Sequence, residues 1–208
     1  IFTTMANFNK DKRIHYTVIV ATIIGLLILF FNKPNRDFVK LSGIIWTTQY
    51  NISFQGEPSI CDSITKIFNE INNSASMFNP NSTISKINAN TPVEPNHHLT
   101  ELYICSKQIH NESNGYFDPT VAPLGNAWGF GTTHEDTPDS ARIDSIRQFV
   151  GFHKTSIDST GKISKLDPRT IIDFSSIAKG YACDEIGRLF KRHKINNFMI
   201  EIGGEICV

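Results

Sequence analysis

The chain has 208 residues, of which 40% are hydrophobic and 19% charged, the composition of a globular protein with a core of its own. Its 20 basic and 20 acidic residues cancel and the basic ones are scattered, so charge does not support nucleic-acid binding. The four cysteines are far apart and form no CxxC pair, which argues against zinc and favours buried small side chains. In an exported protein they could also form disulfides, whose pairing the spacing does not select.

Residues 14–31 are the first predicted element, an apolar stretch without Asp, Glu, Lys or Arg. Its length is close to the lower limit for a helix that crosses a bilayer. The basic residues of segment 1–13 predict that this lead lies in the cytoplasm. A cleaved signal peptide and a buried core helix are the alternatives, although no small-residue cleavage site follows Phe31. We expect a transmembrane signal anchor, with the rest of the chain outside the cytoplasmic (inner) membrane of a bacterium.

The next part of the chain alternates between polar connections and periodic segments. The polar residues 32–40 read as a linker, and 41–54 has the alternation of β-structure. Apolar residues recur at helical spacing over 59–73 and again over 99–111. Between these two predicted helices, 74–96 is rich in Asn, Ser and Pro and predicts a loop with a short helix inside it.

The last third of the chain predicts helices and strands in irregular order. Helices are expected over 139–150 and 178–191, a hairpin over 154–165, and strands over 170–174 and 198–202. Because the elements do not alternate regularly and include hairpins, we expect an α+β fold, with a mixed sheet and packed helices, rather than a doubly wound parallel sheet.

The segment DFSSIAKGY, residues 173–181, follows a predicted strand and opens a helix. Ser175, Ser176 and the neighbouring amides would lie at the helix N-terminus, where the dipole favours phosphate. Asp173 could accept hydrogen bonds from a ligand, and Lys179 could neutralise a diphosphate. An ordinary Asp/Ser helix cap is the alternative. The segment is neither a Walker A loop nor a GxGxxG fingerprint.

Aromatic residues gather in two other segments. In GYFDPTVAPL, two prolines fix the backbone around Tyr116, Phe117 and Asp118, which suits either a ring-stacking wall or a turn over the core. Phe78 belongs to a predicted loop, where a large aromatic side chain indicates packing or ligand stacking.

Four blocks occur in a characteristic order and spacing: 76–88, 114–131, 173–184 and Gly203-Gly204. Together they resemble the ApbE family, the FAD:protein FMN transferases once called thiamine biosynthesis lipoproteins. The resemblance runs from about Leu41 to the C-terminus and implies an ApbE-like domain over 41–208.

The resemblance also implies a role for individual positions. Flavin contacts are implied for Trp46, Phe78, Tyr116, Phe117, Asp118, Asp173 and Lys179. Ser176 corresponds to a residue that contributes to Mg²⁺ coordination. Trp46 stands where the family usually has methionine, and Phe78 lacks the hydroxyl of the tyrosine that is common at its position. No catalytic residue is assigned.

The implied reaction is Mg²⁺-dependent transfer of FMN from FAD to a threonine hydroxyl of an acceptor flavoprotein, with release of AMP. The alternatives are a membrane-anchored FAD-binding protein without transferase activity, an FAD pyrophosphatase that uses water in place of the threonine, and a structural membrane protein. The family's other metal ligands lie in a C-terminal region beyond the matched blocks. Because the chain begins with Ile1 and stops at Val208, directly after a predicted strand, we expect it to be part of a longer protein.

Overall fold

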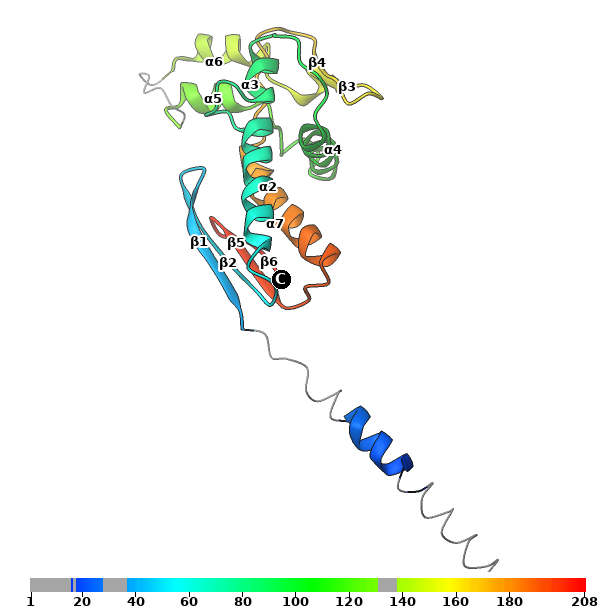
Figure 1. The fold of residues 1–208 in the computed structure, drawn as a ribbon. Coiled ribbons are helices and arrows are strands. Elements are labelled where there is room, and N and C mark those ends of the chain that lie inside the picture. The colour runs from blue at the N-terminus through cyan, green and yellow to red at the C-terminus, as the bar shows by residue number, and fades with distance from the viewer. Residues whose placement is uncertain (1–15, 17, 28–36, 131–137) are drawn as a thin grey trace, which may run out of the picture. The chain divides into compact units, whose positions relative to one another are not determined.

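The computed structural model describes residues 16, 18–27, 37–130 and 138–208. The chain divides into two compact units, Ile1–Asp37 and Phe38–Val208. In the first unit, residues 18–27 are helical (Figure 1). The expected membrane segment 14–31 lies partly outside the described residues. Within the described ranges, no helix combines the length and the hydropathy that crossing a membrane requires.

The second unit contains a four-stranded sheet in the order β1-β2-β5-β6 (Figure 1). The strands are β1 (Val39–Ile45), β2 (Thr48–Phe54), β5 (Phe198–Ile202) and β6 (Glu205–Cys207). Every pairing among these strands is antiparallel, so the sheet is not the mixed one expected from the sequence. The α+β class is confirmed. Because β2 pairs with β5, the sheet joins the two ends of the unit.

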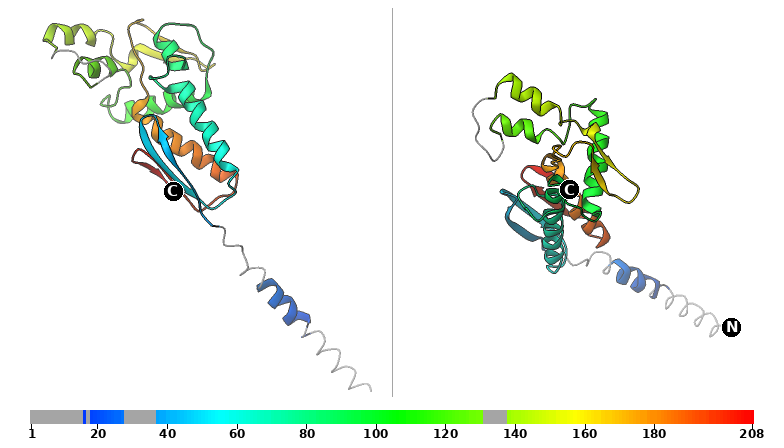
Figure 2. Two further views of the ribbon diagram at one scale, coloured as in Figure 1. Left: turned by 60° about the vertical axis from the view of Figure 1, so that its left-hand side comes forward. Right: turned by 90° about the horizontal axis from the view of Figure 1, so that it is seen from above.

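Two long helices cover one face of this sheet (Figure 2). They are α2 (Ile60–Ala75) and α7 (Ser175–Arg192). The buried side chains of α2 recur every three or four residues, which makes one face of the helix apolar. Phe54 of β2 and Phe190 of α7 are fully buried with their ring centroids 4.8 Å apart. Sheet and helices therefore share one hydrophobic cluster.

A second hydrophobic cluster lies around the N-terminal end of α7. Its elements are α3 (Thr83–Asn88), α4 (His97–Glu112), β3 (Thr155–Ile157) and β4 (Ile163–Lys165). Buried side chains from these elements pack against two residues that precede α7, Ile172 and Phe174. Those from the elements include Ile84, Leu99, Leu102 and Ile163. The two clusters give the second unit a core that runs the length of α7.

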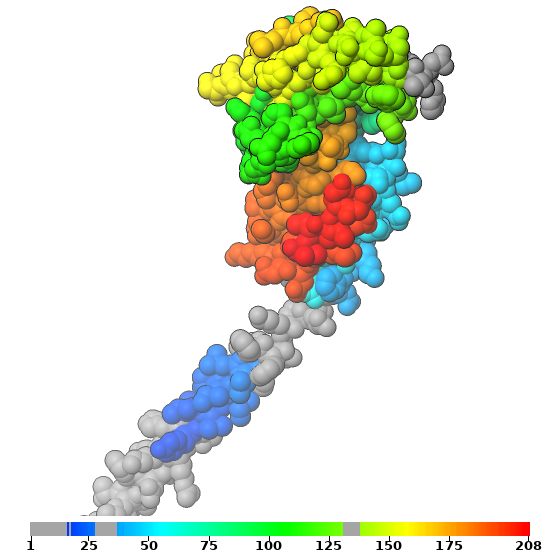
Figure 3. Space-filling model, turned by 180° about the vertical axis from the view of Figure 1, so that it is seen from behind, coloured from blue at the N-terminus to red at the C-terminus, as the bar shows by residue number. Residues whose placement is uncertain are grey.

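Shorter elements complete the second unit. They are α5 (Ala122–Ala127), α6 (Ser140–Arg147) and the 3₁₀ turn η1 (Phe152–Lys154). In a view from behind, the C-terminal residues lie at the surface beside α7 (Figure 3). The segment 170–174 was expected to be a strand, but it pairs with no strand among the described residues. The side chain of Asn88 hydrogen-bonds the backbone of Ile172, and the Pro119 carbonyl accepts from the Asp173 amide.

Candidate functional site

The turn after β1, the loop after α2 and the start of α7 meet around a cavity of about 160 Å³. Its lining is mostly apolar and includes one cation: Trp46, Ile71, Ala75, Ser76, Met77, Phe78, Ser175, Ala178 and Lys179. Three predicted site residues, Trp46, Phe78 and Lys179, are therefore brought together from distant parts of the sequence. Aromatic rings beside an ammonium group are what an aromatic ligand with a phosphate requires.

Trp46 is held by α2 at one side of the cavity. Its Nε1 donates to Asn72 Oδ1 at 3.2 Å, and its ring meets Phe68 edge-on at 5.9 Å. Trp46 and Thr47 form the two-residue turn between β1 and β2, with φ of 48° and 62°. Both values are left-handed, as a type I′ turn requires, and are costly for side chains other than glycine. Backbone strain of this kind is typical of functional sites.

Phe78 extends from the loop between α2 and α3, and 71% of its surface is exposed. The loop is shaped by Ser82, whose hydroxyl donates to the Ser76 carbonyl at 2.7 Å and accepts from the Ser85 amide at 3.1 Å. Ser82 thus caps α3 and fixes the loop at the same time. The ring of Phe78 lies at the cavity with most of its surface still available to a ligand.

Lys179 lies over the turn between β5 and β6. Its Nζ is 3.0 Å from Glu205 Oε1, and the second oxygen of Glu205 is buried without a hydrogen-bond partner in the part of the chain that the structure describes. A Cβ on Gly203 would come within 2.7 Å of Thr48 Oγ1 and 3.3 Å of Lys179 Cδ. Gly203 therefore leaves the space in which the lysine stem lies. Glu205, which directly follows the two glycines, was not predicted as a site residue.

Asp173 links the two most informative segments of the sequence. Its amide donates to the Pro119 carbonyl at 2.8 Å, which joins segment 115–124 to the start of α7. Its Oδ1 accepts from the amide and hydroxyl of Ser175 at 2.8 and 2.5 Å, so Asp173 orders the first turn of α7 in the way a cap does. Ser176 is exposed on that turn.

The remaining predicted residues do not line the cavity. Tyr116 is 95% exposed, and Phe117 is half-buried, with its backbone hydrogen-bonded to the side chains of Ser113 and His110. Both oxygens of Asp118 accept hydrogen bonds from the chain, from Thr120 and from the amide of Phe152. Their flavin contacts stay predictions.

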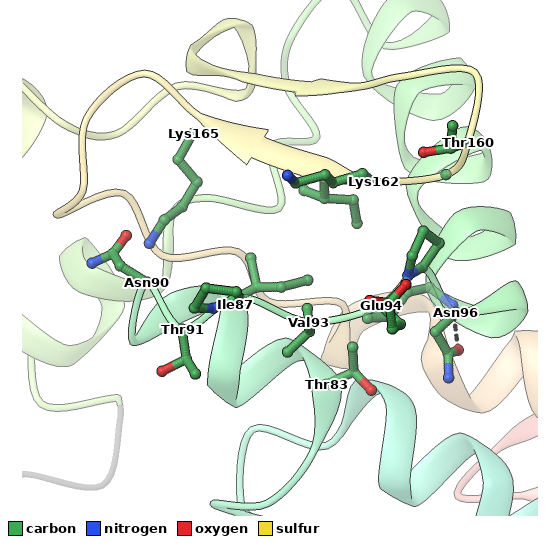
Figure 4. Close-up of a pocket in the computed structure, with 15 residues that line it drawn as sticks. Thr83, Ile87, Asn90, Thr91, Val93, Glu94, Asn96, Thr160, Lys162 and Lys165 are labelled. Atoms are coloured by element: carbon green, nitrogen blue, oxygen red, sulfur yellow. Dashed lines mark hydrogen bonds between the residues drawn. The ribbon is translucent and has the colours of Figure 1, made fainter.

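A larger cavity of about 770 Å³ lies between the loop 90–96 and strand β4 (Figure 4). Lys165 of β4 and Lys162, which directly precedes this strand, line the cavity. Lys165 Nζ donates to three carbonyls at 2.9–3.1 Å, and burial lowers the pKa of this ammonium group. This cavity contains none of the residues that the sequence predicts for the flavin site.

The chain matches the model of the ApbE family over residues 46–208. It is 32% identical over 198 residues to the FAD:protein FMN transferase of Vibrio cholerae and 28% identical over 204 residues to that of Haemophilus influenzae. Each alignment covers 90% of this chain and 59% of the relative, so the chain spans about three fifths of the length of these relatives.

Solved structures give the same result. The flavin transferase ApbE from Vibrio cholerae superposes with a TM-score of 0.74 at 29% identity, over 82% of this chain and 58% of that one. The apo form of the flavinyl transferase ApbE from Pseudomonas stutzeri gives 0.75 at 27% identity, over 82% and 57%. Matched over most of its length in sequence and in fold, the chain belongs to the ApbE family.

Proposed function

We propose that this protein transfers FMN from FAD to a threonine hydroxyl of an acceptor flavoprotein. The proposal is supported by the relatives named as FAD:protein FMN transferases and by the cavity that Lys179 lines. The observation that carries the proposal is that Lys179 lines the same cavity as the aromatic side chains of Trp46 and Phe78 and as Ser175 in the first turn of α7. One cavity thus offers separate surfaces to a flavin ring and to a diphosphate.

Each surface has a distinct task in this proposal. The isoalloxazine ring packs on the cavity's aromatic side, while the diphosphate lies at the N-terminus of α7, where the helix dipole favours an anion. Lys179 offsets part of the diphosphate charge as a point charge, and Glu205 holds its ammonium group in place. Positioning and charge neutralisation are the two contributions that this chemistry requires.

The reaction balances without a further co-reactant. The threonine oxygen forms a bond to the phosphorus of the FMN half, and the bond from that phosphorus to the bridging oxygen breaks. AMP leaves with the bridging oxygen, and the hydroxyl proton is released. The products are a threonine-linked FMN and AMP.

We include Mg²⁺ in the proposal because Ser176 matches a metal-site position of the family. In residues 16, 18–27, 37–130 and 138–208, no three His, Cys, Asp or Glu side chains gather around a common point. No step is therefore assigned to the ion. Loss of FMN transfer after EDTA treatment and its return with added Mg²⁺ would support the requirement, and activity that persists in EDTA would contradict it.

We also propose that segment 14–31 anchors the protein in the bacterial inner membrane, with the transferase domain on its outer side. The support is the apolar, uncharged sequence behind a basic lead. In intact spheroplasts, protease added outside should digest the domain and leave the lead intact. A domain that becomes accessible only after lysis would contradict this topology.

The central experiment compares two lysines in the full-length protein. Removing a charge-assisted contact to phosphate costs about 1.5–3 kcal/mol, so Lys179→Met should weaken FAD binding roughly 10- to 100-fold. Lys162→Met, in the larger cavity, is the matched control and should change the affinity less than about twofold. Equal effects of both substitutions, or no binding of FAD by the unmodified protein, would contradict the proposed site.

Product analysis separates the alternatives. With a threonine-containing acceptor protein, FMN transfer adds the mass of FMN less one water and releases AMP. An FAD-binding protein without transferase activity would quench flavin fluorescence and release no AMP. An FAD pyrophosphatase would release free FMN without any acceptor.

A further inference from the structure

Asn88, the last residue of α3, has an unusual set of partners. Its Oδ1 accepts from the Ile172 amide and its Nδ2 donates to the Ile172 carbonyl, both at 2.9 Å. The same Nδ2 lies 3.2 Å from the sulfur of Met77. One side-chain amide therefore contacts two segments that are far apart in the sequence.

The backbone of Ile172 depends on this amide. Ile172 is fully buried and belongs to no strand, so a neighbouring strand does not pair with its N–H and C=O groups. Buried backbone groups without a partner are costly. An asparagine side chain offers both an N–H donor and a carbonyl acceptor, as the backbone of a paired strand does, and neither ionised aspartate nor leucine offers both.

The two segments that Asn88 joins are the two walls of the candidate site. Met77 precedes Phe78, and both residues line the cavity on its aromatic side. Ile172 precedes Asp173, whose carboxylate orders the first turn of α7 where Ser175 lines the cavity. Asn88 itself does not line the cavity.

We propose that Asn88 is a positioning residue. It sets the distance between the aromatic wall, formed by Met77 and Phe78, and the phosphate wall, formed by the first turn of α7, to the value that FAD requires. The inference rests on the proposed function, because it assumes that one FAD molecule spans both walls. The binding of a ligand that contacts only one wall does not depend on the distance between the two walls. Loss of Asn88 should therefore weaken the binding of FAD far more than the binding of riboflavin, which has no phosphate.

The experiment uses the full-length protein with three substitutions. Asn88→Ala removes the amide, and Asn88→Asp keeps the acceptor for the Ile172 N–H but loses the donor. Asn90→Gly is the matched control, because Asn90 also donates to a distant backbone carbonyl, that of Pro168, at 3.1 Å. Its φ of 58° suits glycine, so the control adds no strain.

Dissociation constants for FAD come from flavin fluorescence quenching, and those for riboflavin from competition with FAD, at a temperature where circular dichroism shows each variant folded. We expect Asn88→Ala to weaken FAD at least 10-fold and riboflavin less than 3-fold, and Asn90→Gly to change both less than 2-fold. If Asn88→Ala does not fold, the same ratio is measured on Asn88→Asp, with the same expected direction.

The outcomes are distinguishable. Equal losses for FAD and riboflavin would show that Asn88 acts only on stability and would overturn the inference. An unchanged FAD affinity would do the same. Failure of the unmodified protein to bind FAD would overturn the proposed function itself, and so would failure of riboflavin to compete, since the aromatic wall would then hold no flavin ring.

Discussion

Asp118 shows how one carboxylate can order a loop that does not line the candidate cavity. Its Oδ1 accepts from the amide and hydroxyl of Thr120 at 2.8 and 2.6 Å, and its Oδ2 accepts from the Phe152 amide at 2.9 Å. The hydroxyl of Thr120 in turn accepts from Gly151 at 2.7 Å. Asp118 therefore ties the segment 115–121 to the turn η1, and this segment carries the carbonyl of Pro119 to which Asp173 donates.

We expect Asp118→Ala to destabilise the protein. It leaves donors of the buried residues Thr120 and Phe152 without their acceptor, which costs about 2–4 kcal/mol. For a domain of this size that corresponds to a fall in the midpoint of thermal unfolding of roughly 5–15 °C, measurable by calorimetry.

Asp158→Ala is the matched control for Asp118→Ala. Asp158 makes the same Asp-x-Thr contacts, to the amide and hydroxyl of Thr160, but in an exposed turn, where water replaces the lost acceptor. Its effect on unfolding should be smaller. Full stability of Asp118→Ala combined with lost FAD affinity would instead support the flavin contact that the sequence predicts.

At the scale of elements, the turn between β1 and β2 carries both strain and a site residue. Trp46 and Thr47 are both left-handed. We expect Thr47→Gly to stabilise the protein by about 0.5–1 kcal/mol, because the release of left-handed strain exceeds the backbone entropy cost of glycine. FAD affinity should stay within about twofold, since the Trp46 ring keeps its contacts to α2.

Urea unfolding of Thr47→Gly beside Thr48→Gly checks this expectation. Thr48 is the first residue of β2, where glycine weakens a strand, so this neighbour should be destabilised. A loss of stability in both variants would mean that the entropy cost of glycine exceeds the left-handed strain that is released at position 47.

The elements that the sequence predicted well are those with a strong period. Helix α2 was expected over 59–73 and lies at Ile60–Ala75, because its apolar residues recur at helical spacing. The segment 170–174 has the composition of a buried strand, yet Asn88 and Pro119 supply its partners. The period of a segment depends on its own residues alone, so a partner side chain 84 residues away leaves no trace in it.

The candidate site was predicted to a similar degree. Trp46, Phe78 and Lys179 line one cavity, and their flavin contacts stay predictions. Glu205 was missed, although an acidic residue directly after two glycines was visible in the sequence. Its role follows from the antiparallel turn between β5 and β6, which brings it to 3.0 Å from Lys179.

At the scale of the whole second unit, α7 joins two hydrophobic clusters. Tyr181 packs against both of them, and its hydroxyl lies 2.8 Å from Nδ1 of His98 on α4. Burial is the main cause that raises the pKa of Tyr181. Because one helix contributes to both clusters, we expect them to unfold together rather than one after the other.

Cys183 can report on this cooperativity. It is 2% exposed in the sheet-side cluster, and burial, followed by the nearby Cys207, raises its thiol pKa to about 12. The folded state thus favours the neutral thiol. Its contribution to the free energy of unfolding is fully present below the ordinary pKa of 9.0 and is lost as the pH rises toward 12. At pH 8 a thiol reagent should therefore modify exposed Cys105 quickly and Cys183 only through unfolding.

The final prediction is that a change in the distant cluster accelerates the labelling of Cys183. Ile84 is fully buried in the cluster around α3 and α4. Ile84→Val costs about 0.5–1.5 kcal/mol, so it should speed labelling roughly 2- to 10-fold if opening is global. Ile200→Val, in the sheet-side cluster, should act similarly, and Leu166→Ala, at an 81% exposed position, should not. Acceleration by Ile200→Val alone, read by mass spectrometry of the labelled peptide, would show that the two clusters unfold separately.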